Sequence, residues 1–171
     1  MTQETDIQME EQDLDNSVQF LSFTLGDEEY GVDILSVQEI RSWEPVSRIP
    51  NVPSYEKGVV NLRGAIVPII DLREKFNLEH SEYTNLTVVV VLQATVKGRS
   101  RTMGVVVDSV SDVINIDKKT MQSAPDFGTK VSTEFINGLA SVNQRMLMLL
   151  DVDKLLKLDG VDDAEENDNE Y

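Results

Sequence analysis

The sequence predicts an all-β fold with short helices, in which one small β unit is used twice. The first observation is a series of short, β-branched segments bounded by Gly, Asn, Asp and Pro, a pattern typical of a β-barrel or β-sandwich. The second is a pair of internal matches that occur in the same order without gaps. The third is that helical signal is confined to brief segments after Asp71 and Asp151.

Ten segments have the composition of strands and are separated by polar stretches. The first, VQFLSFTL, alternates and is followed by the polar turn GDEE. The basic stretch KGRSR (97–101) lies between two strands without interleaved aromatic residues, and it is predicted to be a long, mobile hairpin loop. The predicted strands are 18–25, 30–34, 46–49, 58–62, 65–70, 86–94, 102–108, 113–116, 136–142 and 145–150.

The internal matches indicate a duplication. Residues 31–40 align with residues 104–113, and residues 58–76 align with residues 138–156, with a matching glycine and aspartate in the second pair. Each copy, of roughly 65–70 residues, would bury only a thin core by itself. We therefore expect the two copies to pack on each other.

Asp71 and Asp151 each end a predicted strand and begin a short helical turn. A carboxylate at that position accepts hydrogen bonds from unpaired N–H groups of the turn, which favours a capping role. Asp71 and Glu74 also have the spacing of a capping box. The alternative is an acid–base pair of carboxylates.

The two strands on either side of Arg63-Gly64 are predicted to form a tight hairpin. The second copy has Asn143-Gln144 at the same place. Gly and Asn accept the positive φ of such turns, so Arg63 is expected at the hairpin tip and not inside a strand. The duplicated scaffold does not require an arginine there. Its role is open between a solubilising charge and a specific contact.

The net charge of −16 is concentrated near the ends of the sequence. Residues 1–16 carry six acidic residues and residues 159–171 carry seven, with no basic residue in either, which leaves 18 acids against 15 bases between them. Such segments repel themselves and are predicted to be solvated tails. The acidic run at 159–171 lacks the ligand spacing of a calcium loop. The predicted organisation is an acidic tail at 1–17, a folded region at 18–157 and an acidic tail at 158–171.

Composition also restricts the chemistry and the partners. Without a basic stripe to neutralise phosphates, nucleic acid is not an expected partner. The chain has no cysteine, and its only histidine, His80, lies in a polar stretch that reads as a surface loop. Nucleotide-binding, zinc-protease and nucleophile-elbow motifs are absent from the sequence. We therefore expect a binding or scaffolding protein that has no catalytic residue, cofactor or metal.

Two further expectations concern the cellular location of the protein and the role of its one tryptophan. No apolar run approaches the roughly 20 residues of a membrane helix, and the first residues have neither the basic region nor the apolar stretch of a secretion signal. A cytoplasmic location is expected. Trp43 has two open interpretations, an interface anchor or a lid over the core.

Several motifs together resemble CheW, the bacterial chemotaxis coupling protein family. They are FTLGDEEYGVDILSVQEIR (23–41), IPNVPSYEKGVVNLRGAIVPIIDLR (49–73), MGVVVDSVSDV (103–113) and STEFINGLASVNQRMLMLLDVDKLL (132–156). The resemblance extends over residues 18–157. It implies two SH3-like, five-stranded β-barrel subdomains packed on a shared hydrophobic core, without catalytic activity.

The resemblance also implies partners. Proteins of this family bind the cytoplasmic tips of methyl-accepting chemotaxis receptors and the regulatory domain of the histidine kinase CheA, and so place the kinase under receptor control. The implied state is a monomer in isolation that is recruited, without inserting into the membrane, to receptor arrays at its inner face. The alternative is a CheW-like scaffold for a different kinase or receptor system.

Receptor-binding residues are carried over where the motifs match. The implied receptor-binding residues are Val37, Glu39, Gly58, Asn61, Arg63 and Val88. They suggest a groove between the subdomains that accepts one face of a receptor helix. Val37 and Val88 would supply apolar contact area, while Glu39 and Arg63 could pair at the rim and orient the partner. Kinase contacts are expected at exposed strand edges, without individual residues.

Overall fold

The computed structural model describes residues 17–78, 82–123 and 133–157. His80 and both acidic segments lie outside these ranges, except that Ser17 begins the first strand. The strands are β1 (Ser17–Leu25), β2 (Glu28–Asp33), β3 (Val37–Ser42), β4 (Glu56–Leu62), β5 (Ala65–Asp71), β6 (Val88–Val96), β7 (Arg99–Val107), β8 (Ser109–Asp117), β9 (Ile136–Val142) and β10 (Arg145–Leu150). The short helices are η1 (Ile34–Ser36), α2 (Leu72–Lys75), η2 (Lys118–Thr120), η3 (Thr133–Phe135) and α3 (Val152–Leu155).

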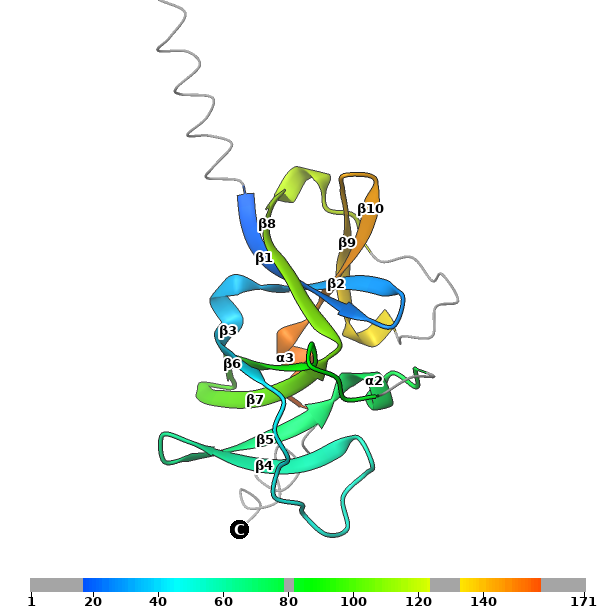
Figure 1. The fold of residues 1–171 in the computed structure, drawn as a ribbon. Helices are drawn as coiled ribbons and strands as arrows, with labels where there is room; N and C mark the ends of the chain where they lie inside the picture. The colour runs from blue at the N-terminus through cyan, green and yellow to red at the C-terminus, as the bar shows by residue number, and fades with distance from the viewer. Residues whose placement is uncertain (1–16, 79–81, 124–132, 158–171) are drawn as a thin grey trace, which may run out of the picture.

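The strands form two five-stranded sheets, as predicted. One has the order β8-β1-β2-β10-β9, here called barrel 1, and the other has the order β3-β6-β7-β5-β4, here called barrel 2. Barrel 1 occupies the upper half of Figure 1 and barrel 2 the lower half. Neighbouring strands are antiparallel except for β2 with β10 and β5 with β7, which are parallel. If each strand of one sequence copy is exchanged for the corresponding strand of the other copy, the strand order of barrel 1 becomes that of barrel 2.

The sequence copy and the spatial unit are different. The first copy contains β1 to β5 with α2, and the second contains β6 to β10 with α3. Barrel 1 combines β1 and β2 with β8, β9 and β10, whereas barrel 2 combines β3, β4 and β5 with β6 and β7. Each barrel therefore takes two strands from one copy and three from the other, which links the two copies far more closely than side-by-side packing would.

Side-chain alternation divides the interior into three apolar clusters. In β6, Val89 and Val91 point into barrel 2, while Val90 and Leu92 point into a larger core between the barrels. In β10, Leu147 belongs to the interior of barrel 1. This arrangement confirms two barrels on a shared core.

An aromatic row joins the barrels within the shared core. Phe23 stacks on Tyr30, Tyr30 contacts Phe76 of the segment after α2, and Phe76 contacts Phe135 of η3, with ring centroids 5.8–6.3 Å apart. Such pairs contribute about 0.5–1.5 kcal/mol each beyond their burial.

Two local predictions were wrong, and one strand was not predicted. Residues 46–49 are not a strand and form only a bridge between Ser47 and Val59. The sequence VQEIRS forms the unpredicted strand β3, whose charged residues suit an edge position. KGRSR is not a long loop, because β6 and β7 pair as far as Val96 with Arg99 and leave a two-residue turn.

None of the described helices has the length and apolar character needed to cross a membrane.

Candidate functional site

The hairpin between β4 and β5 ends in the predicted two-residue turn. Arg63 has φ 54° and Gly64 has φ 88°, and the N–H of Gly64 donates to Asn61 Oδ1 at 2.9 Å. The matching turn in barrel 1 has positive φ at both Asn143 and Gln144. The asparagine before the turn therefore closes it, and the arginine side chain is left pointing outward with 81% of its surface exposed.

Arg63 forms the predicted ion pair with Glu39. Its Nη2 donates to Glu39 Oε2 at 3.4 Å, and Arg41 Nε lies 3.7 Å from Glu39 Oε1. Glu39 is on β3 and Arg63 follows β4, and these are the two edge strands of the sheet. The pair thus spans the seam at which barrel 2 closes. Such exposed pairs contribute only about 0–1 kcal/mol to stability, so the contact orients side chains more than it stabilises the fold.

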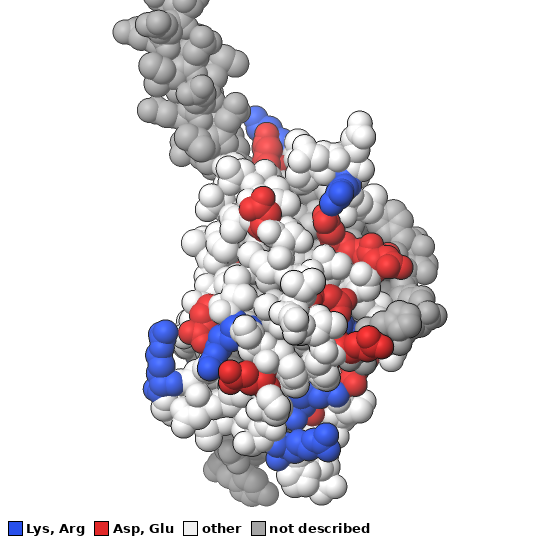
Figure 2. All heavy atoms as spheres, viewed as in Figure 1, with Lys and Arg blue, Asp and Glu red and all other residues white. Residues whose placement is uncertain are grey.

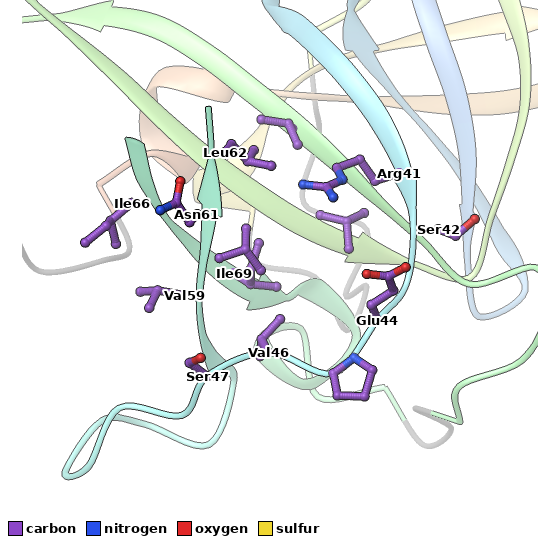
Figure 3. Close-up of a pocket in the computed structure, with 14 residues that line it drawn as sticks. Arg41, Ser42, Glu44, Val46, Ser47, Val59, Asn61, Leu62, Ile66 and Ile69 are labelled. Carbon is purple, nitrogen blue, oxygen red and sulfur yellow. The ribbon is translucent and has the colours of Figure 1, made fainter. Parts of the chain in front are cut away.

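Two neighbouring hollows lie along this seam. One has a volume of about 440 Å³ and includes the ion pair; it is lined by Glu39, Ile40, Arg41, Asn61, Leu62 and Arg63. The other, of about 400 Å³, lies between the chain after β3 and strand β4, with Ile69, Val89 and Val91 among its lining residues (Figure 3). The seam therefore offers polar side chains at its rim and apolar ones below.

Ile66 is an exposed apolar residue at this seam that sequence reasoning missed. It lines the second hollow and exposes 73% of its surface. Because every residue from 65 to 70 is apolar, the run shows no alternation from which to separate the outward-facing Ile66 from the buried Val67.

Gly58 is buried and acts through the backbone. It has φ 145°, and a Cβ at this position would overlap the carbonyl oxygen of Ser47. The N–H of Val59 donates to that same oxygen at 2.9 Å. Gly58 therefore allows the chain after β3 to lie against β4 and so shapes the wall of the hollow, without presenting a side chain.

Val37 and Val88 lie apart from the ion pair. Val37 pairs with Leu92 and Val88 pairs with Ser42, so the two valines lie at opposite ends of the β3–β6 ladder. Both are partly buried and pack against the shared core. The structure thus brings Glu39, Asn61 and Arg63 together at one hollow and leaves only part of each valine accessible.

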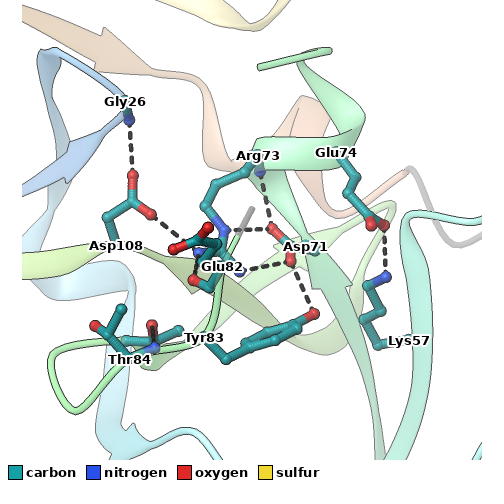
Figure 4. Close-up of polar contacts among 10 residues, drawn as sticks. Gly26, Lys57, Asp71, Arg73, Glu74, Glu82, Tyr83, Thr84 and Asp108 are labelled. Carbon is teal, nitrogen blue, oxygen red and sulfur yellow. Dashed lines mark hydrogen bonds and ion pairs between the residues drawn. The ribbon is translucent and has the colours of Figure 1, made fainter. Parts of the chain in front are cut away.

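A buried polar cluster around Arg73 was missed by sequence reasoning (Figure 4). Arg73 and Asp71 are completely buried, and Nε and Nη2 of the arginine donate to the two oxygens of the aspartate at 3.0 and 2.9 Å. Arg73 Nη1 also donates to Asp108 Oδ1 at 3.0 Å and to the carbonyl of Glu82. The charge of Arg73 is balanced by two carboxylates, which is the condition under which an ion is tolerated inside a protein.

The cluster links the barrels and raises the pKa values of Arg73 and Tyr83. Asp108 Oδ2 accepts from the N–H of Gly26, in the turn between β1 and β2, so the contacts run from barrel 2 to barrel 1. Burial alone would lower the pKa of Arg73, but its hydrogen bonds with Asp71 and Asp108 more than offset this and raise the pKa. Burial, and then the neighbouring Asp71 carboxylate, raise the pKa of Tyr83, whose hydroxyl donates to Asp71 at 3.0 Å.

The capping prediction is confirmed for both aspartates, with one correction. Asp71 accepts from the N–H of Arg73, and Asp151 accepts from the N–H of Lys154. The capping box is wrong, because Glu74 pairs with Lys57 at 2.6 Å and the N–H of Asp71 donates to the carbonyl of Tyr55. With its oxygens occupied by structural donors, Asp71 is unsuited to acid–base chemistry.

The role of Trp43, which the sequence left open, is structural. Trp43 stacks on Tyr83 at a centroid distance of 4.3 Å and packs against the barrel 2 cluster, which favours its role as a lid.

Within the described ranges, no group of three or more His, Cys, Asp or Glu residues is arranged to hold a metal ion. Basic and acidic side chains are interspersed over the face in Figure 2.

Comparison with known proteins gives a consistent family. The CheW-like domain family matches residues 19–159. A chemotaxis protein CheW from Klebsiella aerogenes is 51% identical over 138 residues, which cover 81% of each protein. A chemotaxis protein CheW from Rhizobium meliloti is 34% identical over 137 residues, covering 80% of this chain and 86% of that protein.

A solved structure agrees with this assignment. The crystal structure of the scaffolding protein TtCheW from Thermoanaerobacter tengcongensis has a TM-score of 0.74 at 29% identity, covering 84% of this chain and 90% of that chain. Sequence, strand order and overall shape therefore lead to the same conclusion: this chain belongs to the CheW-like domain family.

Proposed function

We propose that this chain is a non-catalytic chemotaxis adaptor that couples the histidine kinase CheA to the cytoplasmic tips of methyl-accepting chemotaxis receptors. The family match supports the adaptor role. The observation that carries the site is the ion pair between Glu39 and Arg63 at the edge of a partly apolar hollow. An adaptor needs such preformed contacts on a rigid scaffold, because it works by holding two partners and not by turnover.

The receptor docks, in this proposal, along the seam of barrel 2. One face of a receptor helix needs a strip of apolar area with polar groups that set its register. Ile40 and Ile66 supply exposed apolar area, while Arg63 and Asn61 supply charge and hydrogen-bonding groups. Val37 and Val88 contribute through the shape of the β3–β6 ladder, and Gly58 through the position of the chain after β3.

A calorimetric titration against a receptor signalling-tip fragment tests this site. Arg63→Ala removes the exposed charge, and we expect it to weaken binding about 5- to 30-fold, as for loss of an oriented interface charge worth about 1–2 kcal/mol. The matched control is Arg145→Ala, because Arg145 on barrel 1 forms an equivalent exposed pair with Glu29 at 3.2 Å. We expect this control to bind like the wild type.

The outcomes separate the site from the function. Equal weakening by both variants would show that the loss is a general charge effect, and equal binding by all three proteins would place the receptor site elsewhere. Thermal unfolding of each variant checks that the fold is intact. If the wild-type chain binds neither the receptor tip nor the regulatory domain of CheA, the adaptor proposal fails and a CheW-like scaffold of another system becomes the better reading.

A further inference from the structure

We propose that Tyr83 is a positioning residue, which holds Trp43 in place and thereby fixes the wall segment, residues 44–47, along the apolar hollow of barrel 2. Trp43 stacks on Tyr83, and the wall segment follows Trp43 directly in the chain. The position of the wall segment can be measured on this chain alone. The consequence of that position for receptor docking rests on the function proposed above.

The wall segment is attached to the sheet at its two ends. At one end, the N–H of Trp43 donates to the carbonyl oxygen of Thr87 at 3.2 Å. At the other end, Ser47 and Val59 exchange two backbone hydrogen bonds of 3.3 and 2.9 Å in a single bridge. The rest of the wall segment lies along one side of the hollow between these two points (Figure 3). The course of the wall segment therefore depends on how firmly Trp43 and Ser47 are held.

Tyr83 contacts Trp43 through its ring and is itself held by its hydroxyl. The two rings stack at a centroid distance of 4.3 Å, with an angle of 13° between their planes. The hydroxyl donates to Asp71 Oδ2 at 3.0 Å (Figure 4), and the guanidinium carbon of Arg73 lies 4.9 Å from the ring centroid. Because the ring is held at its face and at its oxygen, it has little freedom to turn, and it keeps the indole of Trp43 in one orientation.

The exposure of Tyr83 distinguishes this role from simple core packing. Tyr83 leaves 41% of its surface exposed, whereas Asp71 and Arg73, which it contacts, are completely buried. Arg73 is held in turn by both oxygens of Asp71 and by Asp108. A half-exposed tyrosine removes less apolar area from water than a buried one, so core packing alone does not account for its specific contacts. The buried cluster is a rigid anchor for a residue at the surface.

Barrel 1 forms the corresponding bridge without this anchor. The alignment of the two sequence copies places Asp153 where barrel 2 has Arg73. Barrel 1 nevertheless has the matching backbone bridge, in which Gln122 pairs with Leu139. The arginine cluster is therefore not needed to close a barrel or to form the bridge. Its contact with Trp43 through the tyrosine is specific to barrel 2, which carries the proposed receptor hollow.

Amide hydrogen exchange tests the positioning on the full-length chain without a partner. The N–H of Val59 donates to Ser47 at 2.9 Å, and the N–H of Leu139 donates to Gln122 at 2.8 Å in the matching bridge of barrel 1. In Tyr83→Leu, we expect the protection of the Val59 amide to fall about 3- to 10-fold relative to that of Leu139, as for loss of one aromatic stack. Tyr83→Phe, which keeps the ring but not the hydroxyl, should give a smaller fall.

The fluorescence of Trp43 reports on its own position, because it is the only tryptophan in the chain. Tyr83→Leu should shift the emission to longer wavelength and increase its quenching by acrylamide. The matched control is Leu86→Ala, which removes an exposed apolar side chain from the same segment before β6 and should change neither property. The inference is overturned if Tyr83→Leu leaves the emission and the quenching unchanged. It is also overturned if Val59 and Leu139 lose protection equally, because that would show a general loss of stability.

Receptor binding is measured separately by titration. Tyr83→Leu should weaken binding of a receptor signalling-tip fragment by about 3- to 10-fold, while binding of the regulatory domain of CheA stays at the wild-type level. Equal binding of the receptor fragment by the wild type and by Tyr83→Leu would overturn the link between the wall segment and docking. If the wild-type chain does not bind the fragment at all, the proposed function fails, and hydrogen exchange still decides the role of Tyr83.

Discussion

Gly58 and Gly138 occupy matching positions in the two sequence copies, yet their surroundings differ. Gly58 has φ 145°, and any Cβ would overlap the carbonyl of Ser47. At Gly138 the φ lies outside the left-handed region, so residues with a side chain can adopt it. A Cβ at Gly138 would lie 3.0 Å from the carbonyl oxygen of Gln122, which is a close contact but a smaller overlap than at Gly58. Glycine is therefore required more strictly at position 58 in barrel 2 than at position 138 in barrel 1.

We expect Gly58→Ala to lower the free energy of unfolding by about 1–3 kcal/mol, because it combines a disfavoured φ with backbone overlap. Gly138→Ala should cost clearly less. Urea unfolding of the two variants measures the difference. A comparable loss in both would show that the Ser47 contact does not constrain Gly58.

At the scale of elements, α2 and α3 have the same cap but different surroundings. Asp71 caps α2 while also binding the buried guanidinium of Arg73 and the hydroxyl of Tyr83. Asp151 caps α3 at a partly exposed position through one bond to the N–H of Lys154. Asp71 in barrel 2 is therefore both a cap and a member of the polar cluster around Arg73, whereas Asp151 in barrel 1 serves as a cap alone.

Removing the two caps should therefore have unequal effects. Asp71→Ala leaves a buried arginine with only part of its charge balanced, and we expect a loss of about 3–5 kcal/mol in unfolding free energy. Asp151→Ala removes a cap only, and the expected loss is about 0.5–2 kcal/mol. Chemical denaturation at neutral pH measures both. Equal losses would mean that the Arg73 cluster adds nothing to the cap.

At the scale of the whole molecule, exchange of strands between the sequence copies is the dominant feature. Barrel 1 needs β1 and β2 from the first copy, and barrel 2 needs β6 and β7 from the second. The aromatic row and the contact from Arg73 through Asp108 to Gly26 then hold the barrels together. Since every core draws on both copies, the described fold should unfold as one cooperative unit.

Cutting the chain between residues 80 and 81 tests this exchange. Each fragment retains one complete sequence copy but lacks the partner strands of both barrels, so we expect neither to show a cooperative unfolding transition alone. Mixed together, the fragments should associate and regain the circular dichroism of the intact chain. Independent folding of either fragment, alone or as a dimer with itself, would contradict the interdependence of the copies.

The sequence by itself determined the features that depend on near neighbours. The short strands, the duplication, the two helix caps and the position of Arg63 at a hairpin tip all follow from local composition and spacing. The Glu39–Arg63 pair was expected from the family resemblance together with opposite charge. Motif spacing also identified the family, because a run such as NLRGAIVPIIDLR is specific as a string of letters.

Only the tertiary structure decided which strands meet and which side chains are buried. Arg145 and Glu29 form an ion pair across 116 residues, and β2 pairs with β10 over a comparable separation. The local pattern placed Arg63 at a hairpin tip but gave no sign that Arg73 is buried, and it did not distinguish the exposed Ile66 from the buried Val67. Burial depends on the partners that long-range pairing brings together, and those partners are set by closure of the two barrels and not by adjacent residues.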